Sequence, residues 1–192
     1  NTIKILGKET TSFIQGYFDY DSKKSGSLTV SHLRSSFLPI NAPFNARTVD
    51  LVVCNNQRFI EKYDLTACLK QNGTIIFNTE YDIAKLNEVM SDKMKAELVS
   101  KNIKVYTINA YDIALKAGLG GKINTIMQCA MFKVSNLLPY DVALKNIEET
   151  IEKTYAKKGA KVVQANLKAI KNIEDKITKL DCTKFVLKEK LE

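Results

Sequence analysis

The sequence predicts an α/β protein with three α/β/α layers, a mostly parallel sheet and a helical C-terminal part. Three runs are apolar and β-branched, as is typical of buried strands: Val49–Cys54, Thr74–Asn78 and Ile103–Ile108. Segments with helical character lie between these runs, and such alternation is the rhythm of parallel βαβ units. From Lys122 onward, apolar residues recur at intervals of three and four, which indicates helices that bury one broad face.

The first 48 residues predict three strands and a loop. Thr2–Leu6 is expected to be a short strand that ends at Gly7. Two longer strands should flank the polar turn Asp21–Gly26, because aromatic and aliphatic residues fill both sides of it: Phe13, Ile14, Tyr17, Phe18 and Tyr20, then Leu28, Val30 and Leu33. The short separation favours a hairpin and leaves a parallel pair open. Residues 35–48 contain prolines, Asn and Ser, and are predicted to be a loop.

Caps and turn residues predict the helices between the buried strands. Residues 57–63 should form a short helix, and residues 65–72 a turn or helical piece that ends at Asn72-Gly73, a strong turn signal. Residues 82–101 are predicted to be helical, either as one helix or in two parts, since Ser91 can cap a second part. Another short helix over residues 110–117 should stop at Gly118.

The C-terminal part predicts three helices. The first begins near Lys122 and is broken by Pro139, and the second ends at Gly159. The third carries a narrow apolar stripe formed by Val163, Leu167, Ile170, Ile173, Ile177 and Leu180. Spacing this close to a heptad indicates packing against one neighbour, or against another chain or domain. We therefore expect one domain over residues 1–180 and a tail over residues 181–192.

Charge and hydropathy exclude several classes of protein. The net charge of +8 divides into +3, +2 and +3 over residues 1–60, 61–139 and 140–192, and it is interleaved with acids, so no nucleic-acid partner is expected. No apolar run approaches the roughly 20 residues that a membrane helix needs, and no signal peptide is expected. The lack of an initial Met predicts a fragment or a processed piece.

Cysteine and histidine usage predicts neither a metal site nor catalytic residues. Cys54, Cys68, Cys129 and Cys182 are far apart in sequence, which is typical of a reducing cytosol and excludes a local iron–sulfur cluster. We expect the two in apolar segments, Cys54 and Cys129, to be small core residues. The only histidine, His32, alternates with Leu33 on a predicted strand and is expected to form a structural hydrogen bond.

The turn Asp21–Gly26 is the first candidate binding site. Lys23 and Lys24 supply two adjacent ammonium groups, and Ser22 and Ser25 supply hydroxyl donors. Such a group suits phosphate. A solvated hairpin loop explains the same composition, because the turn matches no motif of defined spacing.

A second candidate lies where Gly118-Leu-Gly-Gly121 leads into the predicted helix near Lys122. A helix N-terminus favours an anion, and Asn124 and Gln128 could each donate a hydrogen bond to a ligand. An ordinary helix C-cap followed by a tight turn explains the glycines equally well. Paired carboxylates in an apolar setting and a Walker pattern are both absent from the sequence, so the chain alone lacks the equipment of an enzyme.

Three long motifs resemble the pyruvate:ferredoxin (flavodoxin) oxidoreductases. The stretch Tyr20-Asp21-Ser22-Lys23-Lys24-Ser25-Gly26, with Thr29-Val30-Ser31-His32-Leu33-Arg34 after it, is similar to the family's Tyr-Asp-Ser-Lys-Lys-Ser-Gly-Gly…Thr-Val-Ser-His-Leu-Arg signature. Gly118–Gln128 and Ile151–Gly159 resemble two further segments of the family in the same order. The match covers residues 1 to about 170 and points to the internal domain that is equivalent to the gamma subunit of 2-oxoacid:ferredoxin oxidoreductases.

The resemblance implies a role in a larger enzyme. The family decarboxylates pyruvate oxidatively with coenzyme A, forms acetyl-CoA and CO2, and reduces ferredoxin or flavodoxin. The resemblance also implies that this domain holds coenzyme A and covers the active site. The residues implied to contact coenzyme A are Ser22, Lys23, Lys24, Ser25 and Asn124. Thiamine diphosphate and [4Fe-4S] clusters belong to other domains of the parent, which is expected to be a cytoplasmic homodimer, and this fragment alone should be inactive.

Two departures from the family pattern bear on affinity. The family has a Gly-rich stretch just before the position of Asn1, and Ser27 stands where the family commonly has Gly. If that stretch supplies part of the phosphate site, the isolated chain should bind weakly. Two other functions stay open: a stand-alone module that binds anions or nucleotides, and a structural domain that only contacts its neighbours.

Overall fold

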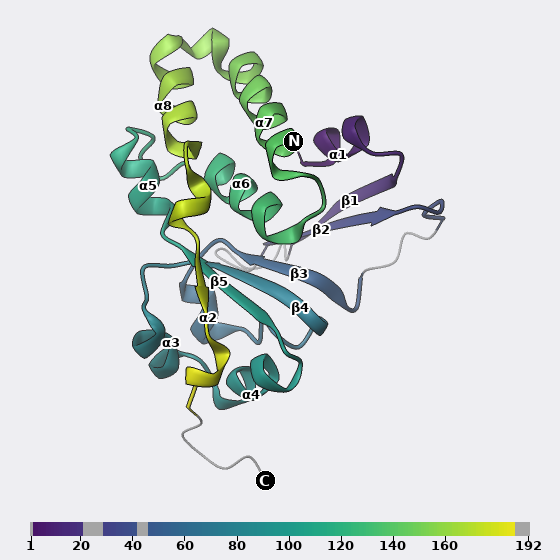
Figure 1. The fold of residues 1–192 in the computed structure, drawn as a ribbon, viewed down its shortest axis with the longest axis vertical. Coiled ribbons are helices and arrows are strands. Elements are labelled where there is room, and N and C mark those ends of the chain that lie inside the picture. Colours follow the sequence, from purple (N-terminus) through teal and green to yellow (C-terminus); the bar gives the residue numbers. More distant parts are fainter. Residues whose placement is uncertain (1, 21–28, 42–45, 187–192) are drawn as a thin grey trace. The chain divides into compact units, whose positions relative to one another are not determined.

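The computed structural model describes residues 2–20, 29–41 and 46–186 (Figure 1). The chain divides into two compact units, Asn1–Arg47 and Thr48–Glu192.

The first unit is a helix followed by a β-hairpin. Helix α1 spans Thr2–Glu9, and strands β1 (Phe13–Tyr20) and β2 (Thr29–Ser36) pair antiparallel from Phe13↔Ser36 to Tyr20↔Thr29. The hairpin prediction is therefore confirmed and the parallel alternative is excluded. The loop predicted over residues 35–48 begins after Ser36, because strand β2 continues to that residue.

The strand predicted over Thr2–Leu6 is wrong, because these residues belong to α1. A five-residue run with β-branched residues fits either structure, and packing decides between them. The helix contacts β1 at Gly16, where any Cβ would collide with the Ile3 side chain. Thr10 ends the helix, since both its N–H and its hydroxyl donate to the Leu6 carbonyl, at 2.9 and 2.8 Å.

The second unit is built on a mixed four-stranded sheet with the order β3-β4-β5-β6. Strands β3 (Val49–Cys54), β4 (Leu69–Asn78) and β5 (Lys104–Ile108) are parallel, and β6 (Thr178–Leu180) is antiparallel to β5. This confirms the mostly parallel sheet. Residues Thr74–Asn78 are buried, as predicted for a central strand.

Two details of the sheet differ from the prediction. Residues 69–73 belong to β4 and form neither a turn nor a helix: the pairing shifts from Val49↔Leu69 to Leu51↔Thr74, so Asn72 (φ 60°) and Gly73 lie in an irregular bulge. Strand β3 was expected to be buried on both faces, but it lies at the edge of the sheet, and its Asp50 is exposed.

Helices cover both faces of the sheet, so the three-layer architecture is confirmed. Helices α2 (Arg58–Lys62), α3 (Ile83–Val89) and α4 (Asp92–Ser100) lie on one face. On the other face lie α6 (Asn124–Ser135), α7 (Tyr140–Tyr155) and α8 (Ala160–Ile170), the helical C-terminal part (Figure 1). The expected break at Ser91 is present, because its hydroxyl accepts a hydrogen bond from Met94 N at 3.2 Å.

The third C-terminal helix is shorter than predicted. Helix α8 ends at Ile170, a 3-10 turn spans Ile173–Lys176, and residues 178–180 form β6. Asn172 adopts a left-handed conformation (φ 54°), which ends the helical path. The helix was predicted to be too long because apolar residues in the 3-10 turn and in β6 continue the spacing of those in α8.

The core between the sheet and α3–α4 is closed by the last described residues. Ile75, Phe77, Leu86 and Leu98 are fully buried there, and Phe185 joins the same cluster. Residues 181–186, which fall in the expected tail, therefore pack on the core.

Candidate functional site

The predicted phosphate-binding turn lies outside the described residues. Ser22, Lys23, Lys24 and Ser25 all fall within residues 21–28. The structure does describe the two strand ends that this segment connects, because Tyr20 pairs with Thr29 as the last step of the hairpin. The assignment of the turn to coenzyme A thus stays a prediction.

One face of the hairpin carries a group of polar and aromatic side chains. The rings of Tyr17 and His32, which face each other across the strands, stack with centroids 4.5 Å apart and an interplanar angle of 5°. The Tyr17 hydroxyl accepts a hydrogen bond from Ala46 N at 2.9 Å, and Arg34 Nη1 donates to Gln15 Oε1 at 3.5 Å. His32 therefore helps to hold the hairpin through a ring contact that the sequence did not predict.

Gly118, the first of the glycines before α6, forms a helix C-cap. Helix α5 spans Ala110–Lys116, and after it the N–H groups of Gly118 and Leu119 donate to the carbonyls of Leu115 and Ala114, at 3.0 and 2.8 Å. Gly118 has φ 79°, so this is a Schellman motif, in which glycine is favoured. An ordinary helix C-cap, one of the two explanations given for these glycines, therefore accounts for Gly118.

Asn124 is exposed and is the first residue of α6. Its amide is accessible to a ligand, and Gln128 follows one turn later, half-buried. Asn124 belongs to the second unit and Lys23 to the first, so a shared site stays a prediction.

Hydrogen bonds around the buried side chain of Asn78 connect the segments that follow the parallel strands, and the sequence did not predict them. Asn78, at the end of β4, donates to the Asn55 carbonyl at 2.9 Å and accepts from Ala110 N at 2.9 Å. Thr79 follows it and donates to Gln57 Oε1 at 3.0 Å. The signal was Asn at the end of each predicted strand, at 55, 78 and 109. These contacts tie the loops together where α/β proteins commonly bind ligands.

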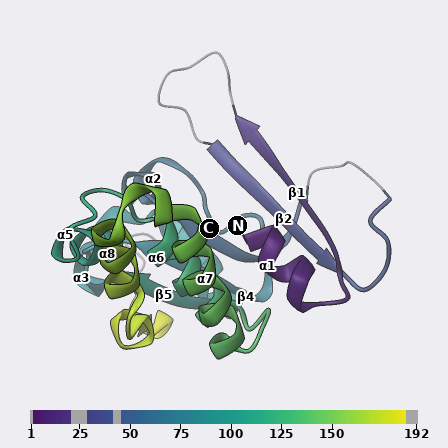
Figure 2. The same ribbon diagram turned by 90° about the horizontal axis from the view of Figure 1, so that it is seen from above.

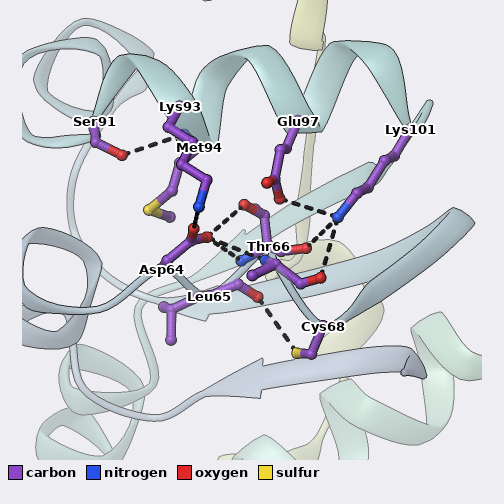
Figure 3. Close-up of polar contacts among 10 residues, drawn as sticks. Asp64, Leu65, Thr66, Cys68, Ser91, Lys93, Met94, Glu97 and Lys101 are labelled. Atoms are coloured by element: carbon purple, nitrogen blue, oxygen red, sulfur yellow. Dashed lines mark hydrogen bonds and ion pairs between the residues drawn. The ribbon is translucent and has the colours of Figure 1, made fainter. Parts of the chain in front are cut away.

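A polar network secures the loop before β4 to α4 (Figure 3). The Asp64 carboxylate accepts from Thr66 N, Thr66 Oγ1 and Ala67 N at 3.0–3.3 Å and pairs with Lys93 at 2.8 Å. From α4, Lys101 Nζ donates to the carbonyls of Thr66 and Ala67. Partial burial raises the pKa of Asp64, but the hydrogen bonds from Lys93 and Thr66 outweigh it, so the net pKa lies below its ordinary value of 3.8.

Burial disfavours the ionised form of two thiols. Burial raises the pKa of Cys54 to about 11 and that of Cys129 to about 12, so both stay protonated at neutral pH. Both are buried, which confirms their prediction as small core residues. Within residues 2–20, 29–41 and 46–186, no three His, Cys, Asp or Glu side chains gather to hold a metal ion. In the same part of the chain, no helix has the length and apolarity to span a membrane.

Solved structures define the class of fold. The chain resembles the pyruvate oxidoreductase subunit PORC of Thermotoga maritima with a TM-score of 0.71 and 20% identity, covering 94% of this chain and 88% of that one. It also resembles the 2-oxoglutarate:ferredoxin oxidoreductase of Magnetococcus marinus, solved with 2-oxoglutarate, coenzyme A and succinyl-CoA bound, with a TM-score of 0.61 and 14% identity over 90% of this chain and 27% of that one. The chain therefore shares its fold with these two proteins.

Sequence relatives define the family. A sequence model described as pyruvate ferredoxin/flavodoxin oxidoreductase matches residues 4–173. The pyruvate-flavodoxin oxidoreductase of Trichormus variabilis is 43% identical over 180 residues, which is 94% of this chain and 15% of that protein. The chain belongs to the pyruvate ferredoxin/flavodoxin oxidoreductase family and spans about a seventh of the length of this relative, which confirms the resemblance that the motifs indicated.

Proposed function

We propose that this chain is the coenzyme A-binding domain of a pyruvate:ferredoxin or pyruvate:flavodoxin oxidoreductase and that it covers the active site of that enzyme. The parent would convert pyruvate and coenzyme A into acetyl-CoA and CO2 and would reduce ferredoxin or flavodoxin. The family match over residues 4–173 carries the proposal. A structural relative solved with coenzyme A bound supports it.

Coenzyme A would be held through its phosphates. Lys23 and Lys24 offer two positive charges in adjacent positions, and Ser22 and Ser25 add neutral donors. Hydrogen bonds between a cation and a phosphate oxygen are roughly twice as strong as neutral ones. Asn124, exposed at the start of α6, would provide a further contact from its amide.

The redox chemistry would take place in other domains of the parent. An iron–sulfur cluster needs several thiolates together, whereas Cys54 and Cys129 are each buried and protonated at neutral pH, so this donor set does not fit a cluster. We propose that thiamine diphosphate and the [4Fe-4S] clusters are bound by those domains, in a cytoplasmic homodimeric enzyme. This chain alone would be inactive.

Calorimetric titration of the 192-residue chain with coenzyme A tests the binding role. We expect saturable binding that Lys23→Ala/Lys24→Ala weakens by about tenfold or more, because two charge-assisted contacts are lost. Lys157→Ala/Lys158→Ala is the matched control, since it removes an adjacent, exposed lysine pair elsewhere in the chain. The control should change the dissociation constant by less than about twofold.

The pattern of ligands separates the alternatives. Binding of other nucleotides that Lys23→Ala/Lys24→Ala weakens, without binding of coenzyme A, would indicate a general anion- or nucleotide-binding module. Equal weakening by both lysine pairs would show that only net charge matters. If coenzyme A and nucleotides both fail to bind, a structural contact domain is the better description.

A further inference from the structure

A hollow of about 320 Å³ lies between α5 and α8, two helices that Figures 1 and 2 show side by side. Packed helices normally fill the space between them with interdigitated side chains. Here small residues, Ala117 and Ala169, line part of the gap and leave it open. The volume lies at the lower end of the range for small-molecule sites.

The lining of this hollow is positively charged. Lys116, Lys168 and Lys176 contribute three ammonium groups and Asp112 one carboxylate, an excess of two positive charges. Lys116 pairs with Asp112 at 2.7 Å, and Lys176 donates to the Lys171 carbonyl at 3.3 Å. Lys168 is exposed, and among the described residues its ammonium group has neither a hydrogen bond nor an ion pair. One cation is therefore available without breaking an existing contact.

The hollow also has an apolar wall and a position typical of ligand sites. Ile113 and Ala169 line it and are largely shielded from solvent. Asn109, another lining residue, directly follows the carboxyl end of β5. Ligands of open α/β sheets commonly bind outside the carboxyl ends of the strands.

We propose that this hollow binds a mononucleotide, with its phosphate monoester between Lys168 and Lys176 and its base against Ile113 and Ala169. A phosphate monoester carries a charge of about −1.5 to −2 at neutral pH, which matches the excess of two positive charges. The volume admits a group of this size and excludes a folded protein. The residues that line this hollow do not include Lys23 or Lys24, and the proposal does not depend on coenzyme A binding.

Titration with AMP, adenosine and inorganic phosphate tests the site. The full chain carrying Lys23→Ala/Lys24→Ala is used, so that the hairpin turn cannot contribute. We expect AMP to bind more tightly than inorganic phosphate and adenosine to bind most weakly, since charge and apolar contact both contribute. Lys168→Gln/Lys176→Gln should weaken AMP binding about tenfold, and added salt should weaken it further.

Two further variants decide whether binding occurs in the hollow. Lys157→Gln/Lys158→Gln removes the same charge elsewhere and should change AMP affinity by less than about twofold. Ala117→Leu keeps the charge but fills space, and it should also weaken binding, with circular dichroism used to confirm the fold. Absence of saturable AMP binding at millimolar concentrations, equal affinity for AMP and inorganic phosphate, or unchanged affinity in Lys168→Gln/Lys176→Gln would each overturn the proposal.

Discussion

At the scale of single residues, Asp64 stabilises the loop before β4 through one carboxylate. It accepts from the backbone of Thr66 and Ala67 and pairs with Lys93, and Thr66 is completely buried. These contacts favour the charged form, so the pKa of Asp64 is lower in the folded chain than in the unfolded chain. The stabilisation is therefore fully present above pH 3.8, and it is lost as the pH falls through the lowered folded-state pKa.

We predict that Asp64→Asn removes this pH dependence. At pH 7 the variant should be less stable than the native chain by about 1 kcal/mol or less, because part of the carboxylate is solvated. The difference should shrink when urea unfolding is repeated at an acidic pH below the lowered folded-state pKa, where the native carboxylate becomes protonated. Asp50→Asn, which removes an exposed ion pair with Lys70, is the control. A difference that stays constant between the two pH values would contradict this account.

Gly73 is predicted to be needed in the bulge of β4. A Cβ at this buried position would lie 2.9 Å from the Lys70 carbonyl oxygen and 3.1 Å from Leu69 Cδ2. Gly73→Ala should therefore lower the free energy of unfolding by about 1–3 kcal/mol, measured by urea titration. At Gly121 a Cβ would have no neighbour within 4 Å, so Gly121→Ala should change stability by no more than about 0.5 kcal/mol. Equal effects would show that the bulge can relax.

At the scale of elements, residues 181–186 act as a closing segment for the α3–α4 layer. The Asn87 amide donates to the Lys184 carbonyl at 3.1 Å and accepts from Val186 N at 2.9 Å. Lys95, fully buried, pairs with Asp92 at 2.7 Å and donates to the Val186 carbonyl at 2.8 Å. The segment is thus bound through both its backbone and its Phe185 side chain.

We predict that Phe185→Ala lowers the free energy of unfolding by about 3 kcal/mol, because it leaves a cavity in the core. Val186→Ala is the matched control: its side chain is 67% exposed, against 7% for Phe185, and the change should be about 0.5 kcal/mol or less. Thermal and urea unfolding measure both variants. If the two substitutions have similar effects, the segment does not belong to the folded core.

The local sequence pattern predicted most helices and strands. The errors occur where contacts between residues far apart in the sequence determine the secondary structure. Neighbouring residues alone determine the buried runs of β4 and β5 and the helix cap at Ser91, so these features could be predicted. By contrast, α1 depends on packing against β1, and β6 is a three-residue strand that exists only because β5 offers an edge. The bulge at Asn72 likewise follows from the pairing of β4 with β3.

At the scale of the whole molecule, the sequence specified the family more fully than the site. The motif around Lys23-Lys24 identified the class of protein, yet composition alone could not separate a phosphate site from a solvated turn. The hydrogen bonds around Asn78 were missed because a polar residue at a strand end has no distinctive spacing. The hollow between α5 and α8 could not be predicted, since Lys116 and Lys168 are 52 positions apart and meet only in the folded chain.

Steady-state kinetics of the full-length parent enzyme test the central claim most directly. Lys24→Ala should raise the KM for coenzyme A by about tenfold or more and change the KM for pyruvate by less than about twofold, because only the coenzyme's phosphates lose a partner. Lys158→Ala should alter neither constant. An unchanged KM for coenzyme A in the Lys24→Ala enzyme would contradict the claim that this domain holds coenzyme A through its lysine pair.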